Sequence, residues 1–505
     1  MQVTIGEMPV TAARRYGDKP AVIATDRTLT FAQLDRLSTQ LAIQLRAQGM
    51  APGDRVTLWM ENGWRWMVAY YAILKLGAVV NPCNILLTRD EVVFIANDCG
   101  ARMIIAALDK AASLADLVRA RIVTDKASQD HDSIDVMLDP AHDLAGIEKL
   151  TVWSDGASPS TIGYTSGTTG HPKGAVLRHS SIVMNTAMTA LMHGRTSSDV
   201  VVSALPCTHV YGNVVMNGAV MCGMTLVLLP RFDETEALQA IQQHRATVFD
   251  GVPTMYMRML NLPGFDAFDL SSLRICTVGG QTMPTARMEE AERRFKCPLI
   301  ELWGMTELGG LGTTHPHNGP RRLGSIGVAL PLSEAKVVAV DNSAVEMPRG
   351  EVGELVIRGP LVMDSYFNNE QATRASIEPE GWLHTGDLVY QDREGYFFVV
   401  DRAKEVIISG GYNIYPAEVE RVIAQHPAVA MVAVAAMPDE LKGEVPKAFV
   451  VPRVGVSCTD KDIIELCRAQ LAPYKVPRAV VFLDDLPKTS TGKILRRMLA
   501  TSVTQ

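Results

Sequence analysis

The sequence predicts an α/β protein with a large N-terminal domain, built from mixed sheets and crossover helices, and a small α+β C-terminal domain. Helical and strand patterns alternate through the early part of the chain, which is typical of a sheet whose strands are joined by helices. Near Arg402 the pattern changes to short strands and short helices. Because 505 residues exceed what one core usually supports, we expect domains at 1–400 and 401–505.

Local signals place the first predicted elements. Thr30 and Gln33 form a capping box, and leucines then recur at helical spacing until Gly49, so a helix is expected between these points. The other expected elements are a strand over 55–60, a helix over 64–76, a strand over 78–80, a helix over 236–244 and a strand over 247–249. The strand over 55–60, the helix over 64–76 and the strand over 78–80 form a strand–helix–strand unit.

Composition and charge exclude several classes of protein. The 48 basic and 55 acidic side chains give a net charge of -7, so we expect no general attraction to nucleic acid. The eight cysteines form no CxxC pair and no zinc-like spacing, which favours reduced thiols in a cytoplasm. The first residues lack a signal-peptide pattern, so no export is expected.

One long uncharged segment, 200–230, raises the question of a membrane span. Pro206, His209, Asn213 and Asn217 interrupt it, and their polar groups would lack partners in lipid. A buried helix followed by a strand is therefore the prediction, and no transmembrane segment is expected.

The segment YTSGTTGHPKG, from Tyr164 to Gly174, combines glycines, hydroxyl residues and a lysine. Such a loop can turn its backbone N–H groups toward an anion, so it is a candidate phosphate cradle. The candidate ligands are Thr165, Ser166, Gly167, Thr168, Thr169, Gly170 and Lys173. Glycine follows Lys173, so the Walker pattern is not matched. On composition alone, a flexible surface turn fits equally well.

This loop resembles the signature loop of the adenylate-forming superfamily, which includes acyl- and aryl-CoA synthetases, firefly luciferase and the adenylation domains of peptide synthetases. Further motifs follow in that family's order across nearly the whole chain. They are LPCTHVYG from Leu205, ELWGMTELG from Glu301, WLHTGD from Trp382, DRAKEVIISGGYNIYPAEVE from Asp401 and PKTSTGKILRR from Pro487. The chain is identified as an ATP-dependent acid:CoA ligase on this resemblance.

The resemblance implies ATP, Mg²⁺ and coenzyme A as cofactors and a small carboxylic acid as substrate. The acid attacks the α-phosphate of ATP, which requires positive charge and oriented donors. Lys493 resembles the catalytic lysine, and Thr306 would contact the α-phosphate. Glu307 and Thr165 are similar to the magnesium ligands, and hard oxygen ligands suit that ion. Without the match between its neighbouring residues and the family motif, Lys493 would be expected to be an exposed surface lysine.

The nucleotide and thiol sites are carried over from the same motifs. Asp387 would accept the ribose hydroxyls, Arg402 would donate to the nucleotide and Trp303 would pack on adenine. Gly279, Gly280, Gln281 and Gly304 complete that site, and Gly410 and Gly411 would line the pantetheine tunnel. Lys404 occupies the family's hinge position, which implies a mobile C-terminal domain.

The acid pocket is expected to be mostly apolar and small. Its candidate residues are His209, Tyr211, Gly212, Val252, Arg258, Gly309 and Gly310. Fatty acids rank first and aryl or phenylpropanoid acids second. Arg258 resembles an arginine that binds the second carboxylate in malonate-type synthetases, although a surface helix arginine explains it more simply. His209 either borders the reacting centre or is a hydrogen-bonded core histidine.

Other readings remain open from the sequence. They are luciferase-type oxidation of the adenylate, a non-catalytic acyl- or nucleotide-binding protein, and a P-loop kinase or ATPase. The presence of Lys493 and Glu307 argues against the non-catalytic reading. Acetylation of Lys493 would remove the charge that adenylation needs. The sequence leaves open whether the chain forms a homodimer.

Overall fold

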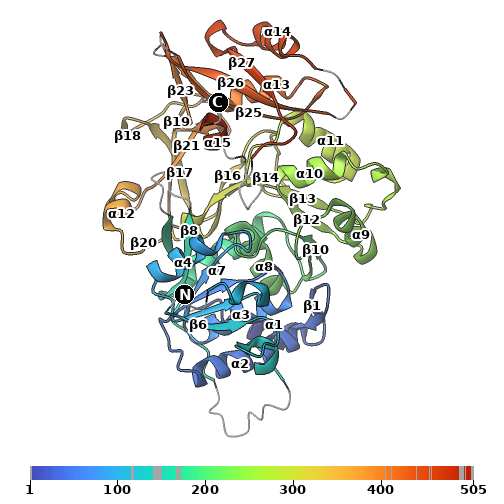
Figure 1. Cartoon of the computed structure of the whole chain (residues 1–505), viewed down its shortest axis with the longest axis vertical. Helices are drawn as coiled ribbons and strands as arrows, with labels where there is room; N and C mark the ends of the chain where they lie inside the picture. The colour runs from blue at the N-terminus through green and yellow to red at the C-terminus, as the bar shows by residue number, and fades with distance from the viewer. Residues whose placement is uncertain are drawn as a thin grey trace.

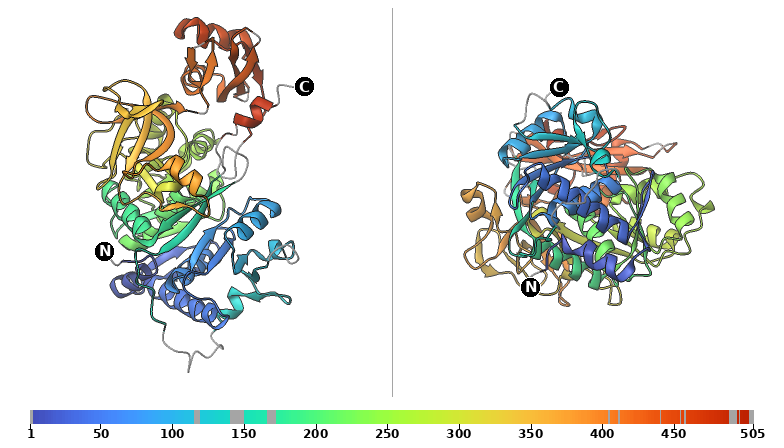
Figure 2. Two further views of the ribbon diagram at one scale, coloured as in Figure 1. Left: turned by 90° about the vertical axis from the view of Figure 1, so that its left-hand side faces the viewer. Right: turned by 90° about the horizontal axis from the view of Figure 1, so that it is seen from below.

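A computed structural model describes residues 3–114, 119–139, 150–165, 172–403, 405–410, 412–439, 441–453, 455–456, 458–487, 494 and 496–501. Figure 1 shows the chain from its blue N-terminal part to its red C-terminal part. The C-terminal sheet and its helices lie at one end of the molecule, and the N-terminal helices lie at the other end (Figure 1 and Figure 2).

Two large sheets, both mixed, form the N-terminal part. One has the order β16 (Val328–Ala329), β15 (Gly310–Thr314), β14 (Leu299–Met305), β13 (Ile275–Val278), β12 (Val248–Gly251), β10 (Val200–Ser203), β11 (Thr225–Leu228), β1 (Pro20–Ile23) and β2 (Thr28–Thr30). The other has the order β20 (Ser365–Tyr366), β9 (Lys173–Arg178), β8 (Pro159–Thr165), β4 (Val79–Pro82), β3 (Arg55–Trp59), β5 (Met103–Ala106), β6 (Arg121–Thr124) and β7 (Asp132–Ser133).

Two smaller sheets follow along the chain. The first is antiparallel, with the order β18 (Asn342–Glu346), β17 (Glu334–Ala339), β19 (Gly353–Arg358), β21 (Leu383–Gln391) and β22 (Phe397–Arg402). The C-terminal sheet has the order β24 (Tyr412–Ile414), β23 (Ile407–Ser409), β26 (Gly443–Pro452) and β25 (Val429–Asp439), and β27 (Ala479–Phe482) pairs with β26.

Helices connect and cover the sheets. In the N-terminal part they are α1 (Glu7–Tyr16), α2 (Phe31–Ala47), α3 (Trp64–Lys75), α4 (Arg89–Asp98), α5 (Leu108–Ala111), α6 (Ile134–Met137), α7 (His179–Met192), α8 (Val210–Cys222), α9 (Glu234–His244), α10 (Pro253–Leu260), α11 (Thr285–Phe295) and α12 (Glu370–Ser376). In the C-terminal part they are α13 (Pro416–Ile423), α14 (Asp460–Gln470) and α15 (Arg496–Thr501). The 3-10 turns are η1 (Phe265–Ala267), η2 (Thr306–Leu308) and η3 (Pro473–Lys475).

The predicted early elements are confirmed. Helix α2 begins after Thr30, whose hydroxyl accepts from the Gln33 backbone at 3.2 Å while the Gln33 side chain accepts from the Thr30 backbone at 2.9 Å. Strand β3, helix α3 and strand β4 follow as expected. In the uncharged segment, the predicted buried helix and strand are α8 and β11. The sequence prediction missed β10, which precedes them.

None of the helices in the described part of the chain combines the length and apolar composition that crossing a bilayer requires. The eight cysteines are free thiols. Burial raises the pKa of the Cys207 thiol to about 12, because a charged thiolate is poorly solvated there.

The C-terminal residues pack around cores of their own. Ile407, Val419 and Val434 belong to one such cluster, which lies apart from the large N-terminal cluster. One link between the parts is a hydrogen bond from the Ala417 backbone N–H to the Asp401 carboxylate, 2.9 Å long. The expected boundary between residues 400 and 401 remains a prediction.

Candidate functional site

The site begins where parallel strands end at one edge of a sheet. Strands β10, β12, β13 and β14 run parallel, so their carboxyl ends meet at the same edge, where ligands of α/β sheets usually bind. Val252 and Gly279 directly follow β12 and β13, Trp303 lies near the end of β14, and His209 lies six residues after β10. Segments far apart in the sequence are therefore brought together.

The hairpin of β8 and β9 approaches this edge. Thr165 pairs with Lys173 across the hairpin, so the strands hold the two ends of the predicted phosphate loop side by side. A Cβ added to Gly163 would lie 2.7 Å from Cγ2 of Thr306. This close packing brings β8 against η2 and places Thr306 and Glu307 beside the base of the loop. A side chain at position 163 would push strand β8 away from η2, so this packing requires glycine.

Glu307 is buried, with 6% of its surface exposed. The Tyr366 hydroxyl donates to Oε1 of Glu307 at 2.7 Å, and the backbone N–H of Met363 donates to the Glu307 carbonyl at 2.7 Å. The Lys173 ammonium lies 5.3 Å from the centre of the Tyr366 ring. Burial, and next the Glu307 charge, raise the pKa of Tyr366, so its hydroxyl keeps its proton and remains a donor. Tyr366 thus orients the Glu307 carboxylate.

Asp387 receives donors on both of its carboxylate oxygens. Trp303 Nε1 donates to Oδ2 at 2.8 Å, and Arg402 Nε lies 2.8 Å from Oδ1. Asp387 and Arg402 are also register partners across β21 and β22. Asp387 is 4% exposed, whereas the Arg402 side chain is 56% exposed. The three predicted nucleotide residues therefore form one cluster with a buried acceptor and an accessible guanidinium.

The acid-pocket candidates surround the start of α8. His209 caps this helix, since its Nδ1 accepts from the Tyr211 backbone at 3.3 Å. A Cβ at Gly212 would lie 2.2 Å from the Pro206 carbonyl oxygen, so only glycine permits this turn of helix. Gly309 has φ 61°, which glycine adopts without strain.

Gly310 lies against a buried asparagine. A Cβ there would come within 2.5 Å of Asn185 Oδ1. Asn185 Nδ2 donates to the carbonyls of Leu308 and Leu311 at 3.0 and 2.8 Å, and its Oδ1 accepts from the Leu311 backbone at 3.2 Å. This side chain from α7 fixes the Gly309–Gly310 turn between η2 and β15.

A buried polar chain begins at Tyr211. Its hydroxyl lies 2.5 Å from Thr277 Oγ1, which donates to Asp250 Oδ1 at 2.5 Å. Since the Thr277 proton points to Asp250, the Tyr211 hydroxyl donates to Thr277. Arg195 Nη2 donates to the same Asp250 oxygen at 2.6 Å, and both side chains of this ion pair are less than 10% exposed.

Two candidates lie away from the clusters described so far. Arg258 is in an ion pair with Glu234, its side chain is 54% exposed, and its guanidinium lies 5.3 Å from the Phe232 ring. Gly410 lies in the exposed turn between β23 and β24, and its N–H donates to the Lys442 carbonyl at 2.8 Å. The structure does not bring Arg258 to the Tyr211 chain.

Three other candidates lie beside strands β13 and β15, and eight lie outside the described residues. Gly280, with φ 89°, and the half-buried Gln281 form the turn after β13, and Gly304 packs on Gly310, whose carbonyl oxygen would lie 2.1 Å from an added Cβ. Ser166, Gly167, Thr168, Thr169, Gly170, Lys404, Gly411 and Lys493 lie outside the described residues.

Sequence reasoning missed Tyr366 and Asn185. Tyr366 contacts a residue 59 positions away, and Asn185 contacts residues 123 and 126 positions away. Neither has a local pattern that points to its partner, so only the pairing of β20 with β9 and the packing of α7 on β15 reveal them.

Comparisons with known proteins show the family to which the chain belongs. A family model described as AMP-binding enzyme matches residues 10–367, and one described as AMP-binding enzyme C-terminal domain matches residues 418–493. A long-chain-fatty-acid–CoA ligase of Bacillus subtilis (strain 168) is 34% identical over 99% of this chain and 95% of the relative. A feruloyl-CoA synthase of Amycolatopsis sp is 35% identical over 97% of each chain.

A solved structure, the anthranilate CoA ligase AuaEII in complex with anthranoyl-AMP, has a TM-score of 0.92 and 27% identity and covers 99% of this chain and 97% of that one. The sequence resemblance and the fold prediction, α/β with mixed sheets plus a smaller C-terminal domain, are confirmed. The chain belongs to the AMP-binding enzyme family, among the acyl-CoA synthetases of the adenylate-forming superfamily.

Proposed function

We propose that this enzyme joins a carboxylic acid to coenzyme A in two steps at one site. The acid first attacks the α-phosphate of ATP, which forms an acyl-adenylate and releases pyrophosphate. The thiol then displaces AMP and forms the thioester. One observation carries the proposal: Trp303, which donates to Asp387 beside Arg402, lies three residues before Thr306, and Thr306 packs on Gly163 of strand β8, which leads into the predicted phosphate loop.

The residues of the predicted nucleotide site suit this reaction. The buried Asp387 carboxylate is an acceptor suited to ribose hydroxyls, and Arg402 is exposed enough to reach a phosphate or the ribose. Lys173 at the end of the loop supplies positive charge beside Glu307 and Tyr366. Fixed positive charge and donors stabilise the charge that develops on the phosphate in the transition state.

The donor set beside the loop fits Mg²⁺. Tyr366 holds one carboxylate oxygen of Glu307, no described residue hydrogen-bonds to the other, and Thr165 offers a hydroxyl at the end of β8. Magnesium typically takes one or two protein oxygens and leaves its other positions to water and substrate phosphates. When bound, the ion neutralises phosphate charge. Glu307 and Thr165 are its proposed ligands.

The C-terminal residues would act in turn. Lys493 is proposed to contact the reacting phosphate in adenylation, and Gly410 and Gly411 to line the thiol path in the second step. Lys404 lies in the segment that joins β22 to the C-terminal sheet, which suits a hinge. A rotation about this segment would present the two faces of the C-terminal domain alternately.

Among substrate classes, a fatty acid is favoured most and an aryl acid next, because α8 and the turn at Gly309 supply mostly apolar and small residues. A dicarboxylic acid is less favoured, since Arg258 is half-exposed and paired with Glu234. No nucleic-acid partner is proposed, because the net charge of -7 gives no general attraction to nucleic acid. We also propose residence in the cytoplasm, which the cysteine pattern favours, and the homodimer stays an open question.

A product assay tests this function. Purified enzyme is incubated with ATP, Mg²⁺ and a panel of fatty, aryl and dicarboxylic acids, with and without coenzyme A, and AMP, ADP and pyrophosphate are measured. AMP and pyrophosphate should appear with at least one acid, together with an acyl-CoA when the thiol is present. Release of ADP would support a kinase or ATPase, and the absence of AMP with every acid would refute the proposal.

A further inference from the structure

Strand β21 is bulged directly beside Asp387. It falls out of register with β19 at this point: between two paired positions, β19 has only Leu355, whereas β21 has residues 385–387. A bulge leaves its extra residues without regular ladder partners and re-aims a side chain. The direction of the Asp387 carboxylate therefore depends on the contacts that hold residues 385–387.

The Gly386 peptide, which precedes Asp387, is held from both sides. Its N–H donates to Glu354 Oε1 at 2.9 Å, and its carbonyl accepts from the Ala403 N–H at 3.0 Å. The φ of Gly386 is 71°, which glycine adopts without strain. The Thr385 hydroxyl accepts from the Asp387 N–H at 3.1 Å. Glu354 is thus the side chain of β19 that fixes the bulge.

Glu354 is in turn held by His384, whose ring lies between two carboxylates. Nδ1 is 2.9 Å from Glu354 Oε2, and Nε2 is 2.9 Å from Glu378 Oε1. Glu378 lies in the turn after α12, where its N–H donates to the Trp382 carbonyl at 2.9 Å. The side chains of His384 and both glutamates are at most 25% exposed, so solvent screens their interactions only in part. The network runs from Glu378 to the peptide that precedes Asp387.

These contacts require a doubly protonated ring. Ionised carboxylates only accept, so each ring nitrogen must donate, and a neutral imidazole has a single N–H. Hydrogen bonds from Ser343 and His384, together with the charge of Lys336 on β17, lower the pKa of Glu378. The backbone donor on Glu354 favours its ionised form. Burial alone would lower the pKa of His384, but the hydrogen bonds to the two carboxylates and their charges outweigh it and raise that pKa.

We propose that His384, in its protonated form, is a positioning residue for nucleotide binding. It holds Glu354, which fixes the Gly386 peptide, and this peptide directs Asp387 toward the ribose hydroxyls. A neutral ring can donate to only one of the two carboxylates and no longer attracts both, so Glu354 is held less firmly. Ribose recognition is therefore present at low pH and is lost as the pH rises and the ring becomes neutral. The inference rests on the proposed function, in which Asp387 accepts from the ribose.

A pair of ligands isolates ribose recognition. The Kd values of AMP and 2′-deoxy-AMP are measured by calorimetric titration of the full-length enzyme across roughly pH 6 to 9, where a histidine with a raised pKa loses its proton. The ratio of the two Kd values cancels the titration of the phosphate, which both ligands carry. We expect 2′-deoxy-AMP to bind about tenfold more weakly than AMP near pH 6, because a hydrogen bond to a carboxylate is strong. The ratio should fall about threefold or more by pH 9, since the carboxylate loses its placement.

Two variants separate the charge of His384 from its bulk. His384→Asn lacks the positive charge, so its ratio should be low at every pH and its KM for ATP raised with kcat nearly unchanged, because ribose contacts act equally in the ground and transition states. His384→Arg is always charged and has several donors, so it should restore the ratio and remove its pH dependence. Burial raises the pKa of Glu301 to about 8, but this carboxyl titrates in every variant. The difference between wild type and His384→Arg therefore reports on His384.

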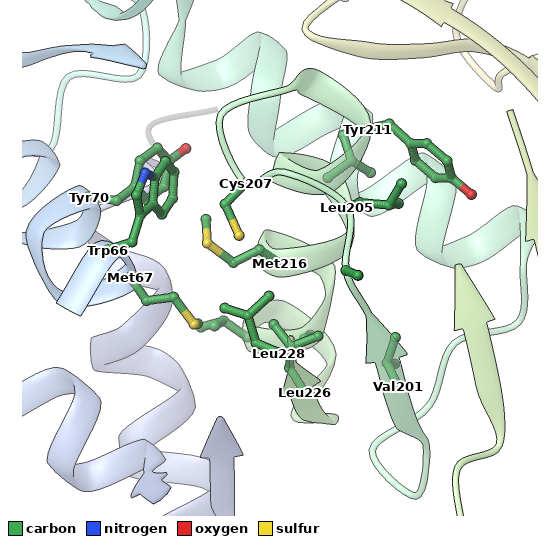
Figure 3. Close-up of a cluster of buried hydrophobic side chains, with 14 of the residues drawn as sticks. Trp66, Met67, Tyr70, Val201, Leu205, Cys207, Tyr211, Met216, Leu226 and Leu228 are labelled. Atoms are coloured by element: carbon green, nitrogen blue, oxygen red, sulfur yellow. The ribbon is translucent and has the colours of Figure 1, made fainter. Parts of the chain in front are cut away.

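Two further variants serve as controls. His244→Asn removes a half-buried histidine from the last turn of α9 and should keep the wild-type ratio and its pH dependence. Met67 is fully buried in the apolar cluster between α3 and α8 that Figure 3 shows. Met67→Ala should lower Tm because it leaves a cavity, and it should keep the wild-type ratio. Loss of stability alone would then not explain a change in ribose recognition.

The outcomes are distinguishable. A wild-type ratio that is constant across this pH range, or the same pH dependence in wild type and His384→Arg, would overturn the inference, while AMP formation in the product assay would leave the proposed function standing. A His384→Asn enzyme with a lowered Tm and the wild-type ratio would also overturn it, because His384 would then have only a structural role. If His384→Asn does not fold, the wild-type profile and His384→Arg decide. Failure to bind AMP, and to form it with the whole panel of acids, would defeat the proposed function and this inference together.

Discussion

Replacing Trp303 by phenylalanine should weaken nucleotide binding about tenfold to a hundredfold. Phenylalanine keeps an aromatic ring for packing on adenine but removes the 2.8 Å hydrogen bond to Asp387 Oδ2. Asp387 is only 4% exposed, so water cannot easily replace the lost donor. A hydrogen bond to a charged group contributes about 1.5–3 kcal/mol, and about 1.4 kcal/mol corresponds to a factor of ten in affinity.

Calorimetric titration with AMP, and KM for ATP in the AMP-release assay, measure this effect. Trp66→Phe is the matched control, because the Trp66 indole is also buried but its Nε1 has no hydrogen-bond partner among the described residues. That variant should change Tm without changing nucleotide affinity. If the two variants weakened AMP binding equally, or if Trp303→Phe left it unchanged, the Trp303–Asp387 hydrogen bond would not orient the ribose acceptor.

Three further predictions concern the proposed Mg²⁺ ligand Glu307, the buried Glu301 carboxyl and Lys493. Tyr366→Phe removes the donor to Glu307 Oε1, so the Mg²⁺ concentration for half-maximal AMP formation should rise about tenfold or more; an unchanged Mg²⁺ requirement would show that Tyr366 does not orient this carboxylate. Burial raises the pKa of Glu301 from 4.5 to about 8, so the protonated folded form is favoured and stability is lost as pH rises from about 4.5 to 8. Glu301→Gln should flatten that decline in Tm measured by calorimetry, and parallel curves for both proteins would contradict the shift. Lys493→Ala should abolish adenylation while thioester formation from a supplied acyl-adenylate survives; equal loss of both steps would argue against a rotating C-terminal domain.

Local features of the sequence were sufficient to predict many elements. The capping box at Thr30 and the stop at Gly49 define α2 because a helix end depends on a few neighbouring residues. Strand β10 was missed because it lies at the start of an uncharged run whose apolar residues fit a helix and a strand alike. The order of strands depends on contacts between distant segments, which no local pattern encodes.

Some residues of the site could be predicted from the sequence and others could not. Asp387, Arg402 and Trp303 were predicted as nucleotide residues through their motifs, and the structure joins them by hydrogen bonds and an ion pair. The ion pair of Arg195 and Asp250 could not be predicted, because the two residues are 55 positions apart and neither lies in a recognisable motif. Its burial becomes visible only when β12 and the end of α7 are placed together.

The burial of Cys207 affects whether this thiol can react with the acyl-adenylate. An acyl-adenylate is an electrophile, and any thiolate nearby could take its acyl group in place of coenzyme A. Cys207 lies two residues from His209, yet burial raises its pKa to about 12, so the thiol stays protonated at neutral pH. Because a protonated, buried thiol is a weak nucleophile, we expect neither the acyl-adenylate nor thiol-directed inhibitors to modify Cys207 while the chain stays folded.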